Sequence, residues 1–131
     1  LAQSSLETGW GTSRFSTGGN ALFGQWTWRT NKGIRPKQRA PGTKHSVLRF
    51  SQLAGSIEDY THNLNSSSHY RSFRSKRSAL RKAGYPIDIW AQKLVEELKK
   101  YSSNSEHYIS TIRAIIRENQ LTGFDNYSLS P

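Results

Sequence analysis

The chain has 131 residues and a formal net charge of +10, from 19 Lys and Arg against nine Asp and Glu. This length fits one domain with a modest hydrophobic core and excludes a multidomain enzyme. The absence of cysteine excludes disulfide scaffolds, thiolate zinc sites and cysteine nucleophiles. Four Trp, six Tyr and five Phe indicate a folded protein, because disordered chains are poor in aromatic residues.

The excess of positive charge favours polyanionic partners, and by itself it does not choose among nucleic acid, an anionic lipid surface and an acidic cell envelope. No apolar run approaches the roughly 18 residues needed to cross a bilayer, so we expect no membrane-spanning segment. Neither a start Met nor a signal peptide opens the chain, and we expect a truncated or processed N-terminus. The four His are too widely spaced for a metal site, and we expect no metal and no cofactor.

In chain order, residues 1–7 look like the end of a helix that Gly9 and Gly11 stop. Residues 22–50 are rich in Gly, Pro and Lys with aromatic residues near both ends, which predicts two strands and a long connection. From residue 52 the apolar residues recur at helical intervals, which predicts a helix over about 52–65.

The segment 66–82 mixes serines with basic residues and predicts short helices or turns. Asp88 and Ser105 are expected to cap two helices with strongly apolar faces, and the tail 122–131 is too polar to predict order. The resulting fold is α+β and predominantly helical, with a helical lobe and a small β-hairpin lobe over about 22–50. A groove between two such lobes is a common place for a ligand site.

Glu7 stands out among the acidic residues because the next carboxylate is Glu58, and eight basic residues lie between them. Trp10 follows closely, between two glycines. A carboxyl group beside an aromatic wall is desolvated and acquires the raised pKa that a general acid needs near neutral pH. The alternative is a glutamate at a helix end that forms an ion pair with a nearby arginine.

Two separated motifs resemble the bacterial peptidoglycan glucosaminidases of glycoside hydrolase family 73. The first is Leu-Glu-Thr-Gly-Trp-Gly at 6–11, preceded by Ala-Gln and followed by Gly-Asn-Ala-Leu-Phe-Gly at 19–24. The second is Ala-Gly-Tyr-Pro-Ile-Asp at 83–88, followed by Trp-Ala-Gln-Lys-Leu at 90–94. The sequence Phe-Gly-Gln-Trp at 23–26 and the segment 112–119 resemble the Bax-type branch of this family. The resemblance covers residue 2 to about 121, which we expect to form a single domain.

The resemblance implies a lysozyme-like fold and hydrolysis of the β-1,4 bond that follows N-acetylglucosamine in peptidoglycan. Glu7 matches the catalytic acid of the family. Tyr85 matches the tyrosine of the Gly-Tyr motif, which lies across the groove from the acid in the family and is important for activity. A core tyrosine packed before a helix is the other interpretation of Tyr85.

The chain departs from the family pattern at the second catalytic group, because no residue between Gly24 and Phe50 is acidic. An inverting glycosidase places a base carboxyl roughly 6.5 to 9.5 Å from the acid, and a retaining one places a nucleophile at about 5 to 5.5 Å. Glu58 and Asp59 are better explained as structural residues of a helix. Two mechanisms of attack on the anomeric carbon remain: the substrate's own acetamido oxygen acts as the nucleophile, or one acid works with a positioned water.

The candidate sugar-binding residues are Asn20, Phe23, Trp26 and Tyr70. Sugars pack their C–H faces on aromatic rings, and we expect one of Trp26 and Trp28 to line the groove. The expected partners are peptidoglycan glycan strands and the anionic envelope of a bacterium, in the periplasm or outside the cell. We expect a monomer and no nucleic-acid partner. A lytic transglycosylase or muramidase, or a non-catalytic basic module that binds cell wall or nucleic acid, are the alternative functions.

Overall fold

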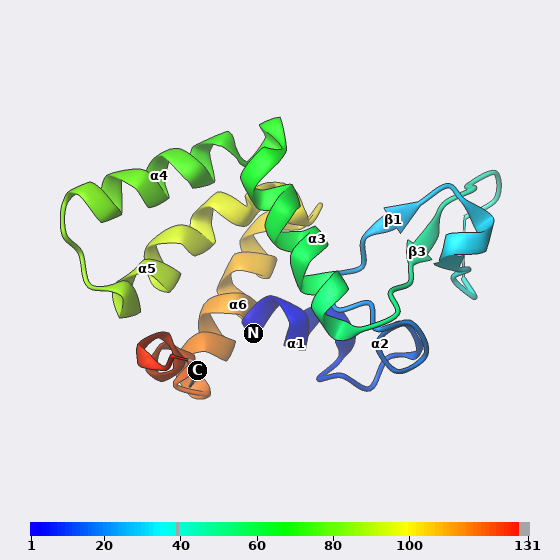
Figure 1. Ribbon diagram of the computed structural model, residues 1–131, viewed down its shortest axis with the longest axis horizontal. Coiled ribbons are helices and arrows are strands. Elements are labelled where there is room, and N and C mark those ends of the chain that lie inside the picture. The colour runs from blue at the N-terminus through cyan, green and yellow to red at the C-terminus, as the bar shows by residue number, and fades with distance from the viewer. Residues whose placement is uncertain (39, 129–131) are drawn as a thin grey trace. The chain divides into compact units, whose positions relative to one another are not determined.

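The protein is described here from a computed structural model, in which residues 1–38 and 40–128 are placed. The chain forms two compact units: Leu1 and Gln3–His62 make up the first, and Ala2 with the chain from Asn63 onward makes up the second. The expected α+β, predominantly helical fold is confirmed, because helices dominate and the strands form one small antiparallel sheet (Figure 1).

The first unit contains two short helices, a small sheet and the beginning of a longer helix. Its elements are α1 (Ala2–Thr8), α2 (Arg14–Gly19), β1 (Trp26–Thr27), the 3-10 helix η1 (Thr30–Lys32), β2 (Gly33–Ile34), β3 (Ser46–Leu48) and most of α3 (Leu53–Ser66). As expected, α1 ends at a glycine: Gly9 is left-handed with φ of 56°, and its N–H bonds the carbonyls of the last helical turn. The Ser13 hydroxyl caps α2 by accepting a hydrogen bond from the Ser16 N–H.

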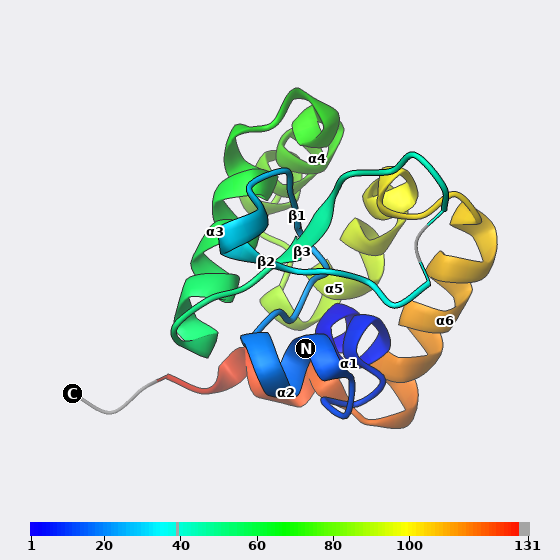
Figure 2. The same ribbon diagram turned by 90° about the vertical axis from the view of Figure 1, so that its right-hand side faces the viewer.

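The sheet has three strands in the order β1-β3-β2, where the sequence pattern predicted two (Figure 2). Both neighbours of β3 run antiparallel to it, with Trp26 opposite Val47 on one side and Ile34 opposite Val47 on the other. The chain turns back after β1 through η1, and Gly33 then lies so close that a Cβ there would be 2.6 Å from the Ser46 Cβ. Glycine is therefore required at this position for the third strand to pair.

The second unit is entirely helical within the described residues. Beyond the end of α3 it contains η2 (Ser68–Tyr70), α4 (Arg71–Lys82), α5 (Ile87–Leu94), η3 (Val95–Tyr101), α6 (Ser105–Glu118) and η4 (Leu121–Asn126). The basic segment, for which short helices or turns were expected, forms the short helix η2 followed by one helix of 12 residues, α4. Its buried anchors Phe73 and Leu80 are two helical turns apart, so packing on one face fixes the whole segment as a helix.

Two helix starts differ from the sequence expectation by one or two residues. The N-cap of α5 is Pro86, so Asp88 lies in the first helical turn and does not cap the helix. The N-cap of α6 is Asn104, and Ser105 is the first helical residue. An acidic residue in the first turn still stabilises a helix, because it faces the positive end of the helix dipole.

The core of the second unit is the apolar face of α6, which packs against η3. The buried residues of these two helices are Val95, Leu98, Tyr108, Ile109, Ile112, Ile115 and Ile116. On α6 they recur at the spacing of one helix face, as the sequence pattern predicted. No helix in the described part of the chain is long and apolar enough to cross a membrane.

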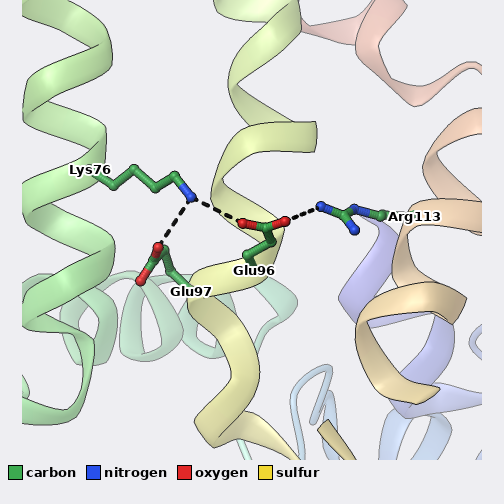
Figure 3. A network of polar contacts seen from close by, with 4 residues as sticks. All are labelled: Lys76, Glu96, Glu97 and Arg113. Atoms are coloured by element: carbon green, nitrogen blue, oxygen red, sulfur yellow. Dashed lines mark hydrogen bonds and ion pairs between the residues drawn. The ribbon is translucent and has the colours of Figure 1, made fainter. Parts of the chain in front are cut away.

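Charged side chains join three helices of the second unit (Figure 3). Lys76 on α4 pairs with Glu96 at 3.3 Å and with Glu97 at 3.2 Å, both on η3. Arg113 on α6 pairs with the other oxygen of Glu96 at 2.7 Å. The hydrogen bond from Arg113 and the contact with Lys76 lower the pKa of Glu96. This carboxylate therefore links α4, η3 and α6 in its ionised form.

Candidate active site around Glu7

The orientation of α1 is fixed by Gln3, which is buried although it is polar. The hydroxyl of Tyr60 on α3 donates a hydrogen bond to Gln3 Oε1. Gln3 and Glu7 are four residues apart and therefore lie on the same face of α1. The contact that holds Gln3 thus also determines the direction in which Glu7 projects.

The segment 22–25 is held against the same helix, α3. The Leu22 N–H donates to Ser56 Oγ at 3.0 Å, and the Gln25 side-chain amide donates to the Ser56 carbonyl at 3.2 Å. Ser56 is fully buried. The ring of Phe23 stacks on that of Tyr60 with centroids 3.9 Å apart and planes 12° apart. α3 therefore positions both the helix that carries Glu7 and the segment that leads into β1.

These contacts place Glu7 against Gly24. A Cβ at Gly24 would lie 3.9 Å from Glu7 Oε2, and Gly24 has a φ of 63°, where side chains are strained. Glu7 itself is exposed, and so is Trp10 at 62% of its surface. The expected shielding of this carboxyl by the indole is thus not seen in the structure.

The turn after Glu7 has an unusual backbone, which the sequence did not indicate beyond its two glycines. Gly9, Trp10 and Gly11 are all left-handed, with φ of 56°, 58° and 80°. A non-glycine residue in this region costs roughly 1–2 kcal/mol. Two hydrogen bonds hold the turn: the Trp10 N–H donates to the Ser5 carbonyl at 2.8 Å, and the Gly11 N–H donates to Thr8 Oγ1 at 2.8 Å. An exposed indole is thereby fixed three residues after Glu7.

Both tryptophans at the start of the sheet are exposed, Trp26 at 59% and Trp28 at 70%. Trp26 stacks on His45, with ring centroids 3.9 Å apart and planes 14° apart. Two residues of extended chain span at most about 7 Å, and the Cα–Cβ bond adds about 1.5 Å, so the Trp26 Cα lies within roughly 13 Å of the Glu7 carboxyl. The acid and an exposed tryptophan therefore belong to the same part of the first unit.

The other sugar-binding candidates of the first unit have structural roles. Asn20 is the left-handed residue that ends α2, and its side-chain amide donates to the Phe50 carbonyl at 3.0 Å. Phe23 is only 8% exposed. Both residues hold the frame in which Glu7 and Trp26 are set.

Tyr85 and Tyr70 belong to the second unit. Tyr85 is 45% exposed and follows the left-handed Gly84. The Trp90 indole donates to the Tyr85 carbonyl at 3.0 Å, and Lys93 Nζ lies 4.9 Å from the Tyr85 ring centroid. Tyr70 is buried, and burial raises the pKa of its phenol.

The first unit therefore places Glu7 against Gly24, in the segment that joins Phe23 to Trp26, and sequence reasoning missed the residues that position it. The spacing of Gln3 and Glu7 on one helix was a usable signal. Ser56 and Tyr60 gave none, because they contact partners more than 30 residues away.

The remaining carboxylates of the first unit, Glu58 and Asp59, lie on α3 as expected. Among the described residues, no group of three or more His, Asp or Glu is arranged to hold a metal ion. The group that this region offers for acid–base chemistry is thus the Glu7 carboxyl, against Gly24.

Comparison with known proteins identifies the class. Residues 1–121 match the Glucosaminidase family, described as mannosyl-glycoprotein endo-beta-N-acetylglucosaminidase, so the chain belongs to this family of glycosidases and the resemblance seen in its motifs is confirmed. Its sequence is 35% identical over 114 residues to Protein bax of Escherichia coli (strain K12). That alignment covers 87% of this chain and 39% of the relative, so the chain spans well under half of that protein. No solved structure matches.

Proposed function

We propose that this chain is the catalytic domain of an endo-β-N-acetylglucosaminidase that cleaves the β-1,4 bond after N-acetylglucosamine in peptidoglycan. The observation that carries the proposal is the setting of Glu7, an exposed carboxyl against Gly24 and within roughly 13 Å of the Trp26 Cα. Membership of the Glucosaminidase family supports a glycan substrate. Such a substrate places the enzyme in the periplasm or outside a bacterium.

In this proposal Glu7 protonates the glycosidic oxygen as the bond from that oxygen to the anomeric carbon breaks. A glycan strand lying over Glu7 excludes water from the carboxyl, the condition under which a carboxylic acid keeps its proton near neutral pH. The nearby segment 24–50 contains no acidic residue to act as nucleophile or base. We therefore assign the attack on the anomeric carbon to the acetamido oxygen of the substrate, followed by opening of the resulting ring by water.

The aromatic and polar candidates take different roles in this scheme. Trp26 is exposed and contacts the sugar face. Asn20 and Phe23 hold the fold of the first unit, through the Asn20–Phe50 hydrogen bond and the Phe23–Tyr60 stack. Tyr70 is buried in the second unit, and its contact with sugar stays a prediction. Tyr85 belongs to the second unit, where the Trp90 indole donates to its carbonyl, and its assistance to the reaction stays a prediction from the Gly-Tyr motif.

Digestion of purified bacterial cell wall tests the role of Glu7. We expect Glu7→Gln to lower the rate about 100- to 10,000-fold, the range for loss of a general acid. Glu58→Gln is the matched control, because it makes the same change at an exposed carboxylate of the same unit; its rate should stay within about twofold of wild type. Full activity in Glu7→Gln would remove the proposed acid.

Mass spectrometry of the products identifies the bond that is cut. N-acetylglucosamine at the new reducing ends supports the proposal. A 1,6-anhydromuramic end identifies a lytic transglycosylase, and a plain muramic reducing end identifies a muramidase. Binding of cell wall without any cleavage identifies a non-catalytic module.

Substrate assistance has its own test. A thiazoline analogue of N-acetylglucosamine mimics the cyclic species formed when the acetamido group attacks the anomeric carbon. We expect it to inhibit at least 100-fold more tightly than the plain sugar, as transition-state analogues do. Inhibition no stronger than that by the plain sugar means that water attacks directly.

A further inference from the structure

The segments that join and flank the strands of the first unit carry a concentration of positive charge that the proposed reaction does not use. Seven Lys and Arg lie between residues 29 and 49, and no carboxylate does. Arg39 lies outside the described residues. The other six are all exposed: Arg29, Lys32, Arg35, Lys37, Lys44 and Arg49.

Backbone hydrogen bonds bring three of these residues together. The Lys32 N–H donates to the Arg29 carbonyl at 3.0 Å, and the Arg49 N–H donates to the Lys32 carbonyl at 3.0 Å. We name Arg29, Lys32 and Arg49 the cation cluster. A fourth cation, the Arg14 guanidinium, is fixed at the neighbouring connection, because Arg14 Nη2 donates to the Arg35 carbonyl at 2.7 Å. The fold thus gathers like charges that repel one another.

The basic residues of α4 differ, since they stabilise their own unit. Arg74 donates to the carbonyls of Leu64 and Ser67 at 2.9 and 2.8 Å. Lys76 pairs with two glutamates of η3, and Arg77 donates to the Asn65 side chain at 2.8 Å. Within the described residues, the ion pairs of the protein include no member of the cation cluster. The charges of the cluster are therefore available to a ligand.

We propose that the cation cluster binds the carboxylates of the peptide side chains that peptidoglycan strands carry, while the neighbouring indole of Trp28 contacts a sugar ring. This inference rests on the proposed function, which brings a glycan strand to the same unit through Glu7. Trp28 adjoins Arg29 and is 70% exposed. The planar guanidinium of arginine matches a carboxylate with two parallel hydrogen bonds. A strand with ionised peptides thereby becomes the preferred substrate over an uncharged chitin-like strand.

The test compares binding to isolated peptidoglycan with binding to the same material after its carboxylates are capped as neutral amides. Wild type should bind the native form about 5- to 30-fold more tightly, since exposed ion pairs are individually weak and three contacts add modestly. The triple variant Arg29→Gln, Lys32→Gln, Arg49→Gln should bind both forms alike. Its cleavage of the capped form should stay within about twofold of wild type, because its remaining contacts with the glycan are intact.

The matched control is the triple variant Lys82→Gln, Lys99→Gln, Lys100→Gln, which removes the same number of positive charges from exposed positions of the second unit. We expect it to bind native peptidoglycan within about twofold of wild type. A control that weakens binding as much as the cluster variant means that net charge alone acts, and it overturns the proposal. The proposal is also overturned if wild type binds the native and the capped peptidoglycan equally well while added phosphate polymers or nucleic acid compete for that binding.

Salt dependence keeps the test valid if the cluster variant does not fold. Wild-type binding to native peptidoglycan should weaken as salt rises from about 0.05 M to about 0.5 M, while binding to the capped form stays nearly constant. Equal salt dependence of the two forms contradicts the proposal. Absence of cleavage on both forms, with the binding preference intact, contradicts the proposed activity and leaves the carboxylate-binding surface in place.

Discussion

The indole of Trp10 is displayed to solvent on a left-handed backbone, with φ of 58° and 62% of its surface exposed. Neither property stabilises the folded protein, because an exposed ring buries little apolar surface and the backbone conformation costs roughly 1–2 kcal/mol. Strain of this kind clusters at functional sites. Trp10 follows Glu7 by three residues, so we infer that it contributes to glycan binding beside the acid.

Two substitutions separate strain from function at this residue. The free energy of unfolding of Trp10→Gly should be about 1 kcal/mol higher than that of Trp10→Ala, because glycine adopts the left-handed conformation without strain. Both variants should digest cell wall more slowly than wild type. Chemical denaturation measures the first effect and product release the second. Equal stability of the two variants refutes the strain, and undiminished digestion by both refutes the role in binding.

At the scale of elements, α3 is the helix that organises the first unit. Tyr60 holds α1 through Gln3, and Ser56 holds the segment that adjoins Glu7. We expect the loss of the Tyr60–Gln3 bond, or of the Ser56 bonds to Leu22 and Gln25, to displace the Glu7 carboxyl relative to Gly24. Placement of the acid thus depends on residues far from it in sequence.

Ser56→Ala tests this arrangement. It leaves the Leu22 N–H without its hydroxyl partner at a fully buried position, which should lower the free energy of unfolding by about 1–3 kcal/mol. Activity should fall as well, because the segment beside Glu7 loses an anchor. Ser72→Ala, at an exposed position of α4, is the control and should change stability by less than about 0.5 kcal/mol. Similar unfolding curves for the two variants argue against the anchoring role.

At the scale of the whole molecule, stability should depend on pH through Glu96. Its pKa is lowered in the folded protein by the hydrogen bond from Arg113 and by Lys76. A carboxyl with a lowered folded-state pKa stabilises the protein above the unfolded-state pKa. That contribution is lost as pH falls below the ordinary value of 4.5 and through the lowered one.

We therefore expect Glu96→Gln to lower the unfolding midpoint near neutral pH and to match wild type once the pH is well below 4.5. Urea denaturation across this range is the measurement. Glu118→Gln, whose carboxylate pairs only with the adjacent Arg117 among the described residues, is the comparison. A difference between Glu96→Gln and wild type that is independent of pH would show that packing, and not charge, links these helices.

Local sequence predicted much of the fold. Periodic apolar residues identified α3 and α6, and Gly9 identified the end of α1. Local patterns were weaker where a distant contact decides the outcome. The third strand depends on the close approach of Gly33 to Ser46, and the single helix α4 depends on the burial of Phe73 and Leu80. Pairing and burial of this kind depend on packing against other elements, which a local sequence pattern does not describe.

The sequence by itself determined the candidate acid, the family of the domain and its strong positive charge. The acid and the family follow from residue types in short motifs, and the charge follows from composition. Only the tertiary structure decided that Glu7 is exposed against Gly24, that Phe23 and Tyr70 are buried, and which cations are already bound to the protein's own groups. The reason is physical: exposure and pairing depend on which distant segments pack together. A side chain's chemistry is set by its covalent structure, and its availability to a ligand is set by the fold.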